Sequence, residues 1–201
     1  MKWTHWPTLQ NELGEKGLAL KGKILNAGSG TRKIKLPNAT KIVNCDLQPL
    51  LGVDVVCDLD KLPFDNAFFD GILSVAVLEH CRHPWMATEE MSRVLKKKGV
   101  LICAVPFFQP IHNIPSDYFR FTPAGLVSIL EEAGFYVENI EFTHSIFHTL
   151  GWLGEDATND KIIWKILFSP LALIIYGLSF LCRQRNIKTA PNVITVVAHK
   201  K

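Results

Sequence analysis

Three apolar segments in the first third of the chain each lead into residues typical of a ligand-binding edge. They are Lys23–Ala27, Lys41–Asp46 and Val53–Asp58. The first is followed by a turn with two glycines, and the other two each end in an aspartate. Because parallel strands present their carboxyl ends at one edge of a sheet, these glycines and carboxylates are expected to meet there. Small residues and carboxylates at that edge predict a cradle for a cofactor that contains adenosine.

The rest of the chain alternates between strand and helix patterns. Further strands are expected at Phe69–Val75, Val100–Val105, Tyr136–Phe142 and Val193–His199. Helices are expected at 8–20, Pro84–Leu95 and Pro123–Ala133. Gly99 and Gly134 are expected to end the last two helices. This alternation predicts an α/β fold with a mostly parallel sheet and helices on both faces.

The glycine turn, Gly28-Ser29-Gly30, lacks one feature that a diphosphate site requires. The dinucleotide-binding fingerprint has a third glycine that opens a helix, and Lys33 stands at that position here. The turn therefore disfavours a nicotinamide cofactor. Asp46 is placed to accept hydrogen bonds from the hydroxyls of a ribose, and Asp58 to hold the amino group of an adenine. Taken alone, each aspartate is also a common cap of a turn.

Five segments together carry a pattern that one family of enzymes shares. They are Ile24–Gly30, Val43–Asp46, Val53–Phe64, Phe68–His80 and Glu90–Pro106. Through them, and most specifically through Leu78-Glu79-His80 and the following Glu90-x-x-Arg93, the chain resembles a class I S-adenosylmethionine-dependent methyltransferase of the type 11 group. The resemblance covers about residues 20–143 and the last strand. It implies a Rossmann-like sheet of seven strands, S-adenosyl-L-methionine as cofactor and methyl transfer as activity.

The resemblance also implies which residues bind the cofactor. The expected set is Asn26, Gly28 and Gly30 near the methionine part, Asp46 at the ribose, Leu47 against the adenine, Asp58 and Leu59 at the adenine amine, and Ala76 under the sulfonium. Two positions depart from the family pattern. Asn26 stands where the family often has an acidic residue, and Arg32 where it often has a third glycine. An asparagine can still organise a turn by hydrogen bonding.

The segment around His80 offers the first candidate base for an acceptor hydroxyl. His80 follows Glu79 and is itself followed by Cys81 and His83. These ligand types are crowded into four residues without a distant partner pair, so no metal site is predicted. His80 is expected either to act as a base or to pack under the cofactor site.

The loop 106–121 offers the second candidate, because it follows a strand at the expected ligand edge. His112 is the acid/base candidate in this loop, since the pKa of a histidine lies in the useful range. Asp117 and Arg120 are expected to orient His112 or to bind hydroxyl groups of the substrate. The alternative is an Asp117–Arg120 pair that holds the loop in place, with Tyr118 and Phe121 in the core.

Residues 161–188 form an apolar insert before the last strand. The stretch Ile166–Cys182 carries no charge, and basic residues flank it at Lys161, Lys165, Arg183, Arg185 and Lys188. The segment is just long enough to span a bilayer, but one crossing would separate the last strand from its sheet. We therefore expect a helix-turn-helix, divided at Pro170 and Gly177, that lies on a membrane surface or covers the substrate pocket. A buried helical insert or a dimer contact is the alternative.

These expectations describe one domain. It has an N-terminal helix (1–22), a core (23–143), an apolar helical insert (144–190) and a last strand (191–201). A net charge of +3 does not favour a nucleic-acid partner. Five cysteines without paired spacing favour a reducing compartment, so we expect a cytoplasmic protein, held at the inner face of a membrane if the insert binds lipid.

The acceptor of the methyl group is not specified by any of these patterns. We expect a small-molecule, glycan or lipid-linked acceptor. The alternative function is a non-catalytic protein that binds S-adenosylmethionine, or a membrane-associated scaffold.

Overall fold

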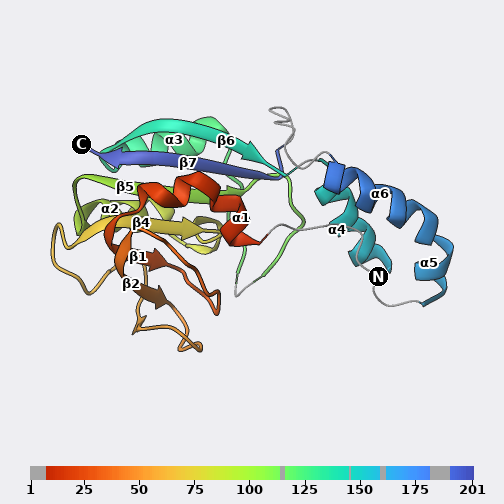
Figure 1. Cartoon of the computed structure of the whole chain (residues 1–201), viewed down its shortest axis with the longest axis horizontal. Helices are drawn as coiled ribbons and strands as arrows, with labels where there is room; N and C mark the ends of the chain where they lie inside the picture. The colour runs from red at the N-terminus through yellow and green to blue at the C-terminus, as the bar shows by residue number, and fades with distance from the viewer. Residues whose placement is uncertain (1–7, 114–115, 145, 159–161, 182–190) are drawn as a thin grey trace.

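A seven-stranded sheet forms the centre of the structure (Figure 1). The computed structural model describes residues 8–113, 116–144, 146–158, 162–181 and 191–201. The strands are β1 (Gly22–Ala27), β2 (Ala39–Asp46), β3 (Val55–Val56), β4 (Phe69–Val75), β5 (Leu95–Pro106), β6 (Phe135–Thr143) and β7 (Val193–Lys200). Their order is β3-β2-β1-β4-β5-β7-β6, and only β7 runs antiparallel to its neighbours. The predicted fold class is confirmed.

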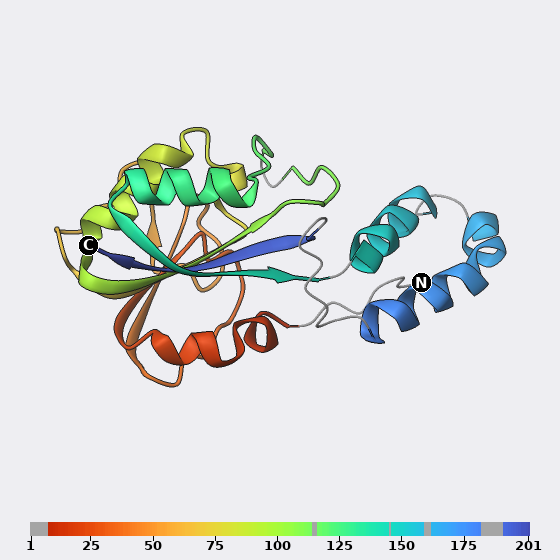
Figure 2. The same cartoon turned by 90° about the horizontal axis from the view of Figure 1, so that it is seen from above.

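Helices cover both faces of the sheet (Figure 2). The helix α1 (Leu9–Leu13) and the 3-10 helix η1 (Gly14–Ala19) lie on one face, and α2 (Pro84–Val94) and α3 (Pro123–Glu132) lie on the other. The ends of α3 follow from its sequence: the Thr122 side chain accepts a hydrogen bond from the Gly125 N–H, and Gly134 takes a positive φ just after the helix. A second 3-10 helix, η2 (Leu78–His80), follows β4.

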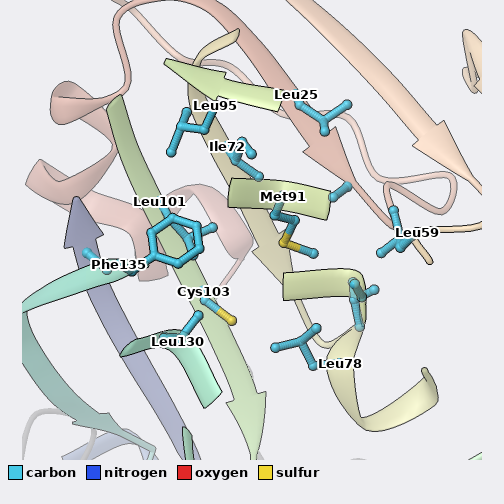
Figure 3. Close-up of a cluster of buried hydrophobic side chains, with 14 of the residues drawn as sticks. Leu25, Leu59, Ile72, Leu78, Met91, Leu95, Leu101, Cys103, Leu130 and Phe135 are labelled. Carbon is cyan, nitrogen blue, oxygen red and sulfur yellow. The ribbon is translucent and has the colours of Figure 1, made fainter. Parts of the chain in front are cut away.

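The two faces of the sheet bury separate hydrophobic clusters. In β1, Leu25 points toward the α2 and α3 side (Figure 3), whereas its neighbour Ile24 packs with Leu13 on the α1 side. The side chains of Ile24 and Leu25 are both fully buried. Because both faces are covered, the central strands are continuous apolar runs rather than alternating ones. Each such side chain stabilises the fold by roughly 1.5–3 kcal/mol through burial.

Two predicted boundaries were wrong. Gly99 does not cap α2; strand β5 begins directly at Leu95, which pairs with Phe69. The residues after Leu95 form a bulge in which Lys98, rather than Gly99, takes a positive φ of 61°. The third strand is also shorter than predicted. It is an edge strand that pairs with β2 over two residues, and Asp58 therefore lies in the loop beyond it.

The helices α4 (Ile146–Thr158), α5 (Ile162–Leu167) and α6 (Ser169–Leu181) project from the edge at which β6 ends (Figures 1 and 2). Pro170 lies in the first turn of α6, where no backbone donor is lost. Gly177 lies inside α6 and does not divide the segment, contrary to prediction. Among the described residues, no helix is long and apolar enough to cross a membrane. The boundaries 144 and 190 stay predictions, since 182–190 lie outside the described residues, as do 1–7.

Candidate active site

A cavity of about 550 Å³ opens at the carboxyl ends of β1, β2 and β4. Seven of the eight predicted cofactor-binding residues line it: Gly28, Gly30, Asp46, Leu47, Asp58, Leu59 and Ala76. His80 and His112 line it as well. Its volume lies in the range of cavities that enclose a ligand the size of a cofactor or drug. The fold therefore assembles the predicted edge, although the predicted roles of these residues remain to be tested.

The two glycines of the turn shape the cavity in different ways. Both take a positive φ, of 64° at Gly28 and 55° at Gly30. A Cβ atom on Gly28 would lie 2.4 Å from a methyl group of Val77, so protein packing excludes a side chain there. A Cβ atom on Gly30 would meet nothing within 4 Å. Gly30 thus leaves free space on the cavity side, which allows a ligand to approach the backbone.

Asp46 fixes the floor of the cavity through its carboxylate. One oxygen accepts a hydrogen bond from the Gly30 N–H at 2.8 Å, and the other accepts one from the Gln48 N–H at 3.1 Å. Each carboxylate oxygen has a further lone pair, so both can still accept a hydroxyl from a ligand. Asp58 similarly accepts from the Asp60 N–H at 3.1 Å. Both aspartates therefore act as turn caps and also line the cavity.

Asn26 is the predicted cofactor residue that does not line the cavity. It is 5% exposed, and its amide donates a 2.9 Å hydrogen bond to the Asn44 side chain on β2. Asn44 in turn donates to Asp54, both from its backbone N–H and from its amide. Asn26 therefore ties β1 to β2 beneath the turn, and its predicted contact with a cofactor stays a prediction.

Arg32, which replaces the family's third glycine, closes the turn from the side. Its guanidinium donates to the Gly28 carbonyl at 3.2 Å and to the Val75 carbonyl at 2.7 Å. Burial lowers its pKa from the usual value.

Ala76, the first residue after β4, takes a φ of 55°, which is strained for a residue with a Cβ atom. Such strain at a cavity wall is typical of functional sites.

The Glu90-x-x-Arg93 pattern holds the loop that carries Asp58 and Leu59. Glu90 accepts a hydrogen bond from the Leu62 N–H at 2.8 Å, while Arg93 donates to the Leu62 carbonyl at 2.9 Å. The two side chains also pair with each other at 2.6 Å. Arg93 lowers the pKa of Glu90 through that hydrogen bond. Glu90 and Arg93 therefore shape the cavity from a distance, without lining it.

The far end of the cavity brings His80 and His112 together around Glu79. The His80 and His112 rings lie edge to face with centroids 5.2 Å apart. The Glu79 carboxylate oxygen Oε1 is 3.6 Å from Nε2 of His80 and 3.8 Å from Nε2 of His112. Glu79 is fully buried, and this carboxylate raises the pKa of His112. Glu79 was not among the predicted site residues.

Asp117 holds the loop 106–121 rather than lining the cavity. Its carboxylate is 2% exposed and accepts hydrogen bonds from the Arg120 guanidinium and from the His112 N–H. Arg120 lowers the pKa of Asp117 to about 2. This is the arrangement of the alternative interpretation, with Phe121 buried as expected but Tyr118 exposed. In this structure Asp117 positions His112.

Helix α4 packs on the same loop. Thr149 donates to the Phe108 carbonyl at 2.6 Å and accepts from the Asn192 amide at 2.8 Å. The ring of Trp152 lies with its centroid 5.5 Å from that of His112. Helix α4 is therefore in direct contact with His112 at the far end of the cavity.

The geometry defines the fold. A seven-stranded sheet in the order 3-2-1-4-5-7-6, with a ligand cavity at the carboxyl ends of its first strands, is the class I methyltransferase fold. Solved structures share it at low identity. One is a 4+2 cyclase, with a TM-score of 0.65 and 18% identity over 94% of this chain and 78% of that one. Another is the Burkholderia thailandensis 1,6-didemethyltoxoflavin-N1-methyltransferase with bound S-adenosylhomocysteine, with a TM-score of 0.61 and 15% identity over 93% and 74%.

Sequence comparison finds similarity over part of the chain. Residues 27–103 match the model of a methyltransferase domain family, and this match confirms the predicted resemblance. A malonyl-acyl-carrier-protein O-methyltransferase from Herminiimonas arsenicoxydans is 34% identical over 103 residues, covering 45% of this chain and 39% of the relative. The chain spans 36–42% of the length of the curated relatives it matches.

Proposed function

We propose that the protein is an S-adenosylmethionine-dependent methyltransferase. One observation supports the proposal: seven residues predicted to bind the cofactor line one cavity, in a chain whose residues 27–103 match a methyltransferase domain. Two curated relatives are named as an O-methyltransferase and a probable S-adenosylmethionine-dependent methyltransferase, and one neighbour has bound S-adenosylhomocysteine. These support the predicted cofactor.

The residues present fit this cofactor. Asp46 retains lone pairs for ribose hydroxyls, and Leu47, which is 57% exposed, offers an apolar surface for an adenine. The open space at Gly30 admits the chain of the methionine part close to the backbone. When bound, S-adenosylmethionine supplies a methyl group activated by its sulfonium. The protein's part is to align the acceptor and to exclude water.

The acceptor is proposed to bind at the far end of the cavity. His80, His112, Ser116 and Tyr118 line this end and offer nitrogen, carbonyl and hydroxyl groups. We retain His80 and His112 as the candidates that act on an acceptor hydroxyl, with Asp117 as a positioning residue. The acceptor atom gains the methyl group as the bond from sulfur to carbon breaks, and a hydroxyl acceptor loses its proton in the same reaction.

Calorimetry tests cofactor binding first. The full chain is titrated with S-adenosylhomocysteine and, separately, with NAD. Micromolar binding of S-adenosylhomocysteine without binding of NAD is expected, and the reverse result would replace methyl transfer with a redox function.

Metabolite profiling of a deletion strain, focused on lipid and glycan fractions, then tests turnover. A lost methyl group is expected there, and its identity names the acceptor.

A non-catalytic protein that binds S-adenosylmethionine is the rival. The cyclase among the structural neighbours shows that this fold is not restricted to proteins named methyltransferases. Binding of S-adenosylhomocysteine together with an unchanged methyl profile in the deletion strain, and no turnover on lipid or glycan extracts, would favour that rival.

We further propose that α5 and α6 hold the protein at a membrane surface. Large apolar side chains are exposed on both helices: Ile163, Ile166, Leu167, Leu171, Leu173, Ile174 and Leu181. Ile163 and Leu173 are each 69% exposed. Exposed apolar residues in such number mark an interaction surface, and the basic residues that flank the segment in the sequence complement anionic lipid headgroups. Since α4 joins this unit to the cavity end, a lipid-linked acceptor suits the arrangement.

Flotation with liposomes tests this surface. The full chain is expected to float with vesicles that contain anionic phosphatidylglycerol and to float less with neutral phosphatidylcholine. The triple variant Ile163→Ser, Leu173→Ser, Ile174→Ser should lose most of the floating fraction. The matched control is Leu51→Ser, which removes an 87% exposed leucine from a loop near the cofactor end. Equal flotation of the triple variant would reject the membrane surface.

We propose the cytoplasmic face of the membrane as the location, because the described cysteines are free thiols and a reducing compartment keeps thiols free.

A further inference from the structure

Glu79 is a buried carboxylate with few partners. Its side chain is 0% exposed, and neither carboxylate oxygen accepts a hydrogen bond from a described residue. Its backbone carbonyl accepts from the Tyr118 and Phe119 N–H groups, so the residue is held in place. A buried carboxylate is costly unless a positive charge or several donors compensate it.

The two arginines in the field of Glu79 are both committed elsewhere. Arg120 pairs with Asp117, and Arg32 donates to backbone carbonyls. Both act on Glu79 only through the longer-range field. The groups that face the carboxylate directly are the imidazoles of His80 and His112.

Both imidazoles turn the same nitrogen toward Glu79. Nδ1 of His80 lies 2.5 Å from the Ser116 carbonyl oxygen, and Nδ1 of His112 lies 3.0 Å from the Pro110 carbonyl oxygen. A carbonyl only accepts, so these contacts favour a hydrogen on each Nδ1 and a lone pair at Nε2 of each neutral ring. Arg120 Nη2 also lies near Nδ1 of His112, but at 3.5 Å it is farther away than the Pro110 carbonyl. Histidines that bind metals are typically oriented in this way, by a hydrogen bond from the other ring nitrogen to a carbonyl or carboxylate.

The distances fit a metal ion. One ligand atom from each of Glu79, His80 and His112 lies within 4.8 Å of the others. Ligands bound at 2.0–2.1 Å in a tetrahedral site lie about 3.4 Å from one another. The separations of 3.6 and 3.8 Å between Glu79 Oε1 and the two Nε2 atoms exceed that by a few tenths of an ångström. Small side-chain rotations would therefore close the site.

We propose that Glu79, His80 and His112 bind a divalent first-row transition-metal ion at the acceptor end of the cavity. Two imidazoles and one carboxylate suit Mn²⁺, Fe²⁺, Co²⁺ or Zn²⁺ better than Mg²⁺ or Ca²⁺, which prefer oxygen ligands. Both histidines line the cavity, so an ion held by them would be accessible to a molecule in it. Three protein ligands with an open position are typical of catalytic rather than structural metal sites.

The consequence for the reaction rests on the proposed function. An acceptor hydroxyl bound to the ion would release its proton to solvent water, since a bound cation lowers the pKa of an oxygen ligand. The resulting oxygen anion would form the bond to the methyl carbon as the bond from that carbon to sulfur breaks. In this arrangement the ion replaces a histidine base, because an Nε2 lone pair cannot hold both a metal and a proton.

The test uses the metals alone, without cofactor or acceptor. The chelator-treated full chain is titrated with Co²⁺, Mn²⁺, Zn²⁺ and Mg²⁺ by calorimetry, and Co²⁺ binding is followed by its visible absorption. One ion per chain is expected, with Mg²⁺ binding weakest. The substitutions Glu79→Gln and His112→Asn should each lower the affinity about a hundredfold or more, since each removes a direct ligand, whereas loss of an outer partner alone costs 10–100-fold.

The neighbouring histidine provides the matched control. His83 belongs to the same short sequence pattern as His80, but its Nδ1 lies 2.9 Å from Asp60 and it is not part of the cluster. His83→Asn should leave the metal affinity unchanged. Absence of binding, or binding that survives both Glu79→Gln and His112→Asn, would overturn the proposal.

Folding and cofactor binding are measured on the same samples. Circular dichroism and the affinity for S-adenosylhomocysteine verify that each variant is native, and His80→Asn replaces Glu79→Gln should the latter not fold. Intact binding of S-adenosylhomocysteine without metal binding rejects the metal site alone. Metal binding without S-adenosylhomocysteine binding rejects the proposed function and leaves the metal site standing.

Discussion

The two ends of the cavity are built by different means. At the cofactor end, backbone groups dominate: the turn at Gly28 and Gly30 follows β1, and Asp46 is fixed by two backbone N–H groups. At the acceptor end, side chains dominate. Glu79 and His80 come from η2, whereas His112 comes from a distant loop on which α4 packs.

The cofactor end uses features that any protein with this sheet can have, whereas the acceptor end depends on side chains particular to this protein. Strand ends and glycine turns recur wherever the same sheet binds a ligand at its carboxyl edge. A buried carboxylate between two histidines depends on one particular loop and on the insert that supports it. The cofactor end should therefore respond to backbone changes and the acceptor end to side-chain chemistry. Variants at one end should leave the other largely intact.

The largest effect is expected at Gly28. Gly28→Ala places a Cβ atom against Val77 and retains a positive φ. The free energy of unfolding should fall by about 2–4 kcal/mol, from strain and overpacking together. Gly30→Ala keeps the same backbone strain without the clash and should lose about 1 kcal/mol. Urea unfolding measures both.

Calorimetry with S-adenosylhomocysteine then compares the ligand affinities of the Gly28→Ala and Gly30→Ala variants. The Cβ atom of Gly30→Ala points into open cavity space, so this variant should bind less tightly despite its smaller loss of stability. If both variants lose stability equally, the distinction between a packing glycine and a ligand-facing glycine is wrong.

The second effect concerns the Asp46 carboxylate. Asp46→Asn keeps the size of the side chain but removes its charge and replaces one acceptor by a donor. The affinity for S-adenosylhomocysteine should fall by about 10–100-fold, as expected for loss of hydrogen bonds to a charged group. Asp54→Asn is the matched control, because Asp54 also accepts from a neighbouring strand but does not line the cavity. Unchanged affinity in Asp46→Asn would refute the ribose assignment.

The cofactor end could be predicted from the sequence because its signals are local. Apolar runs followed by glycine or aspartate mark the carboxyl ends of strands in a parallel sheet. Gly28, Asp46 and Asp58 each follow such a run, so they could be predicted to lie close together. Contacts across strands are harder to predict. Asn26 was placed near the cofactor by the resemblance, and the sequence does not indicate that its amide donates to Asn44 on β2.

The acceptor end could be predicted only in parts. His80 and His112 each stood out as single candidates, but nothing local indicates that both rings face Glu79. That pairing depends on how the loop 106–121 folds back, which is set by Asp117 and by contacts from α4. The bulge at Lys98 was missed for a similar reason, since the pairing of Leu95 with Phe69 places it there and glycine seemed the better candidate for a turn.

The third effect tests whether Asp117 belongs to the acceptor end alone. Asp117→Asn weakens a buried carboxylate that accepts from Arg120 and from the His112 N–H. The free energy of unfolding should fall by about 1–3 kcal/mol, because charged hydrogen bonds of this kind contribute that much. Asp156→Asn makes the same change at an exposed position of α4 and should stay within about 0.5 kcal/mol. Denaturant unfolding provides the comparison.

The affinity for S-adenosylhomocysteine decides the meaning of that result. We expect it to be the same in Asp117→Asn as in the native protein, since Asp117 does not line the cavity. A tenfold loss of affinity would show that the loop 106–121 also organises the cofactor end, and the division of the cavity into two independent ends would then fail.

The smallest effect is expected on the outer surface of α6. Ile174 and Ile175 are adjacent and identical in chemistry, but Ile174 is 58% exposed and Ile175 is 9% exposed. Ile174→Ser should change the free energy of unfolding by no more than about 0.5 kcal/mol, whereas Ile175→Ser should cost about 2–4 kcal/mol through loss of a packed side chain. Thermal and urea unfolding in the absence of lipid measure both variants.

An unchanged free energy of unfolding in Ile174→Ser must be interpreted together with vesicle binding by the same variant. An apolar side chain that contributes nothing to folding, yet weakens flotation when removed, is one that contacts lipid. If Ile174→Ser is instead as destabilising as Ile175→Ser, then Ile174 is covered in the native protein. Sedimentation would show whether a second copy covers it, through a shift from dimer to monomer in the variant. That outcome would turn the exposed faces of α5 and α6 into a subunit contact and remove the physical basis for a lipid-linked acceptor.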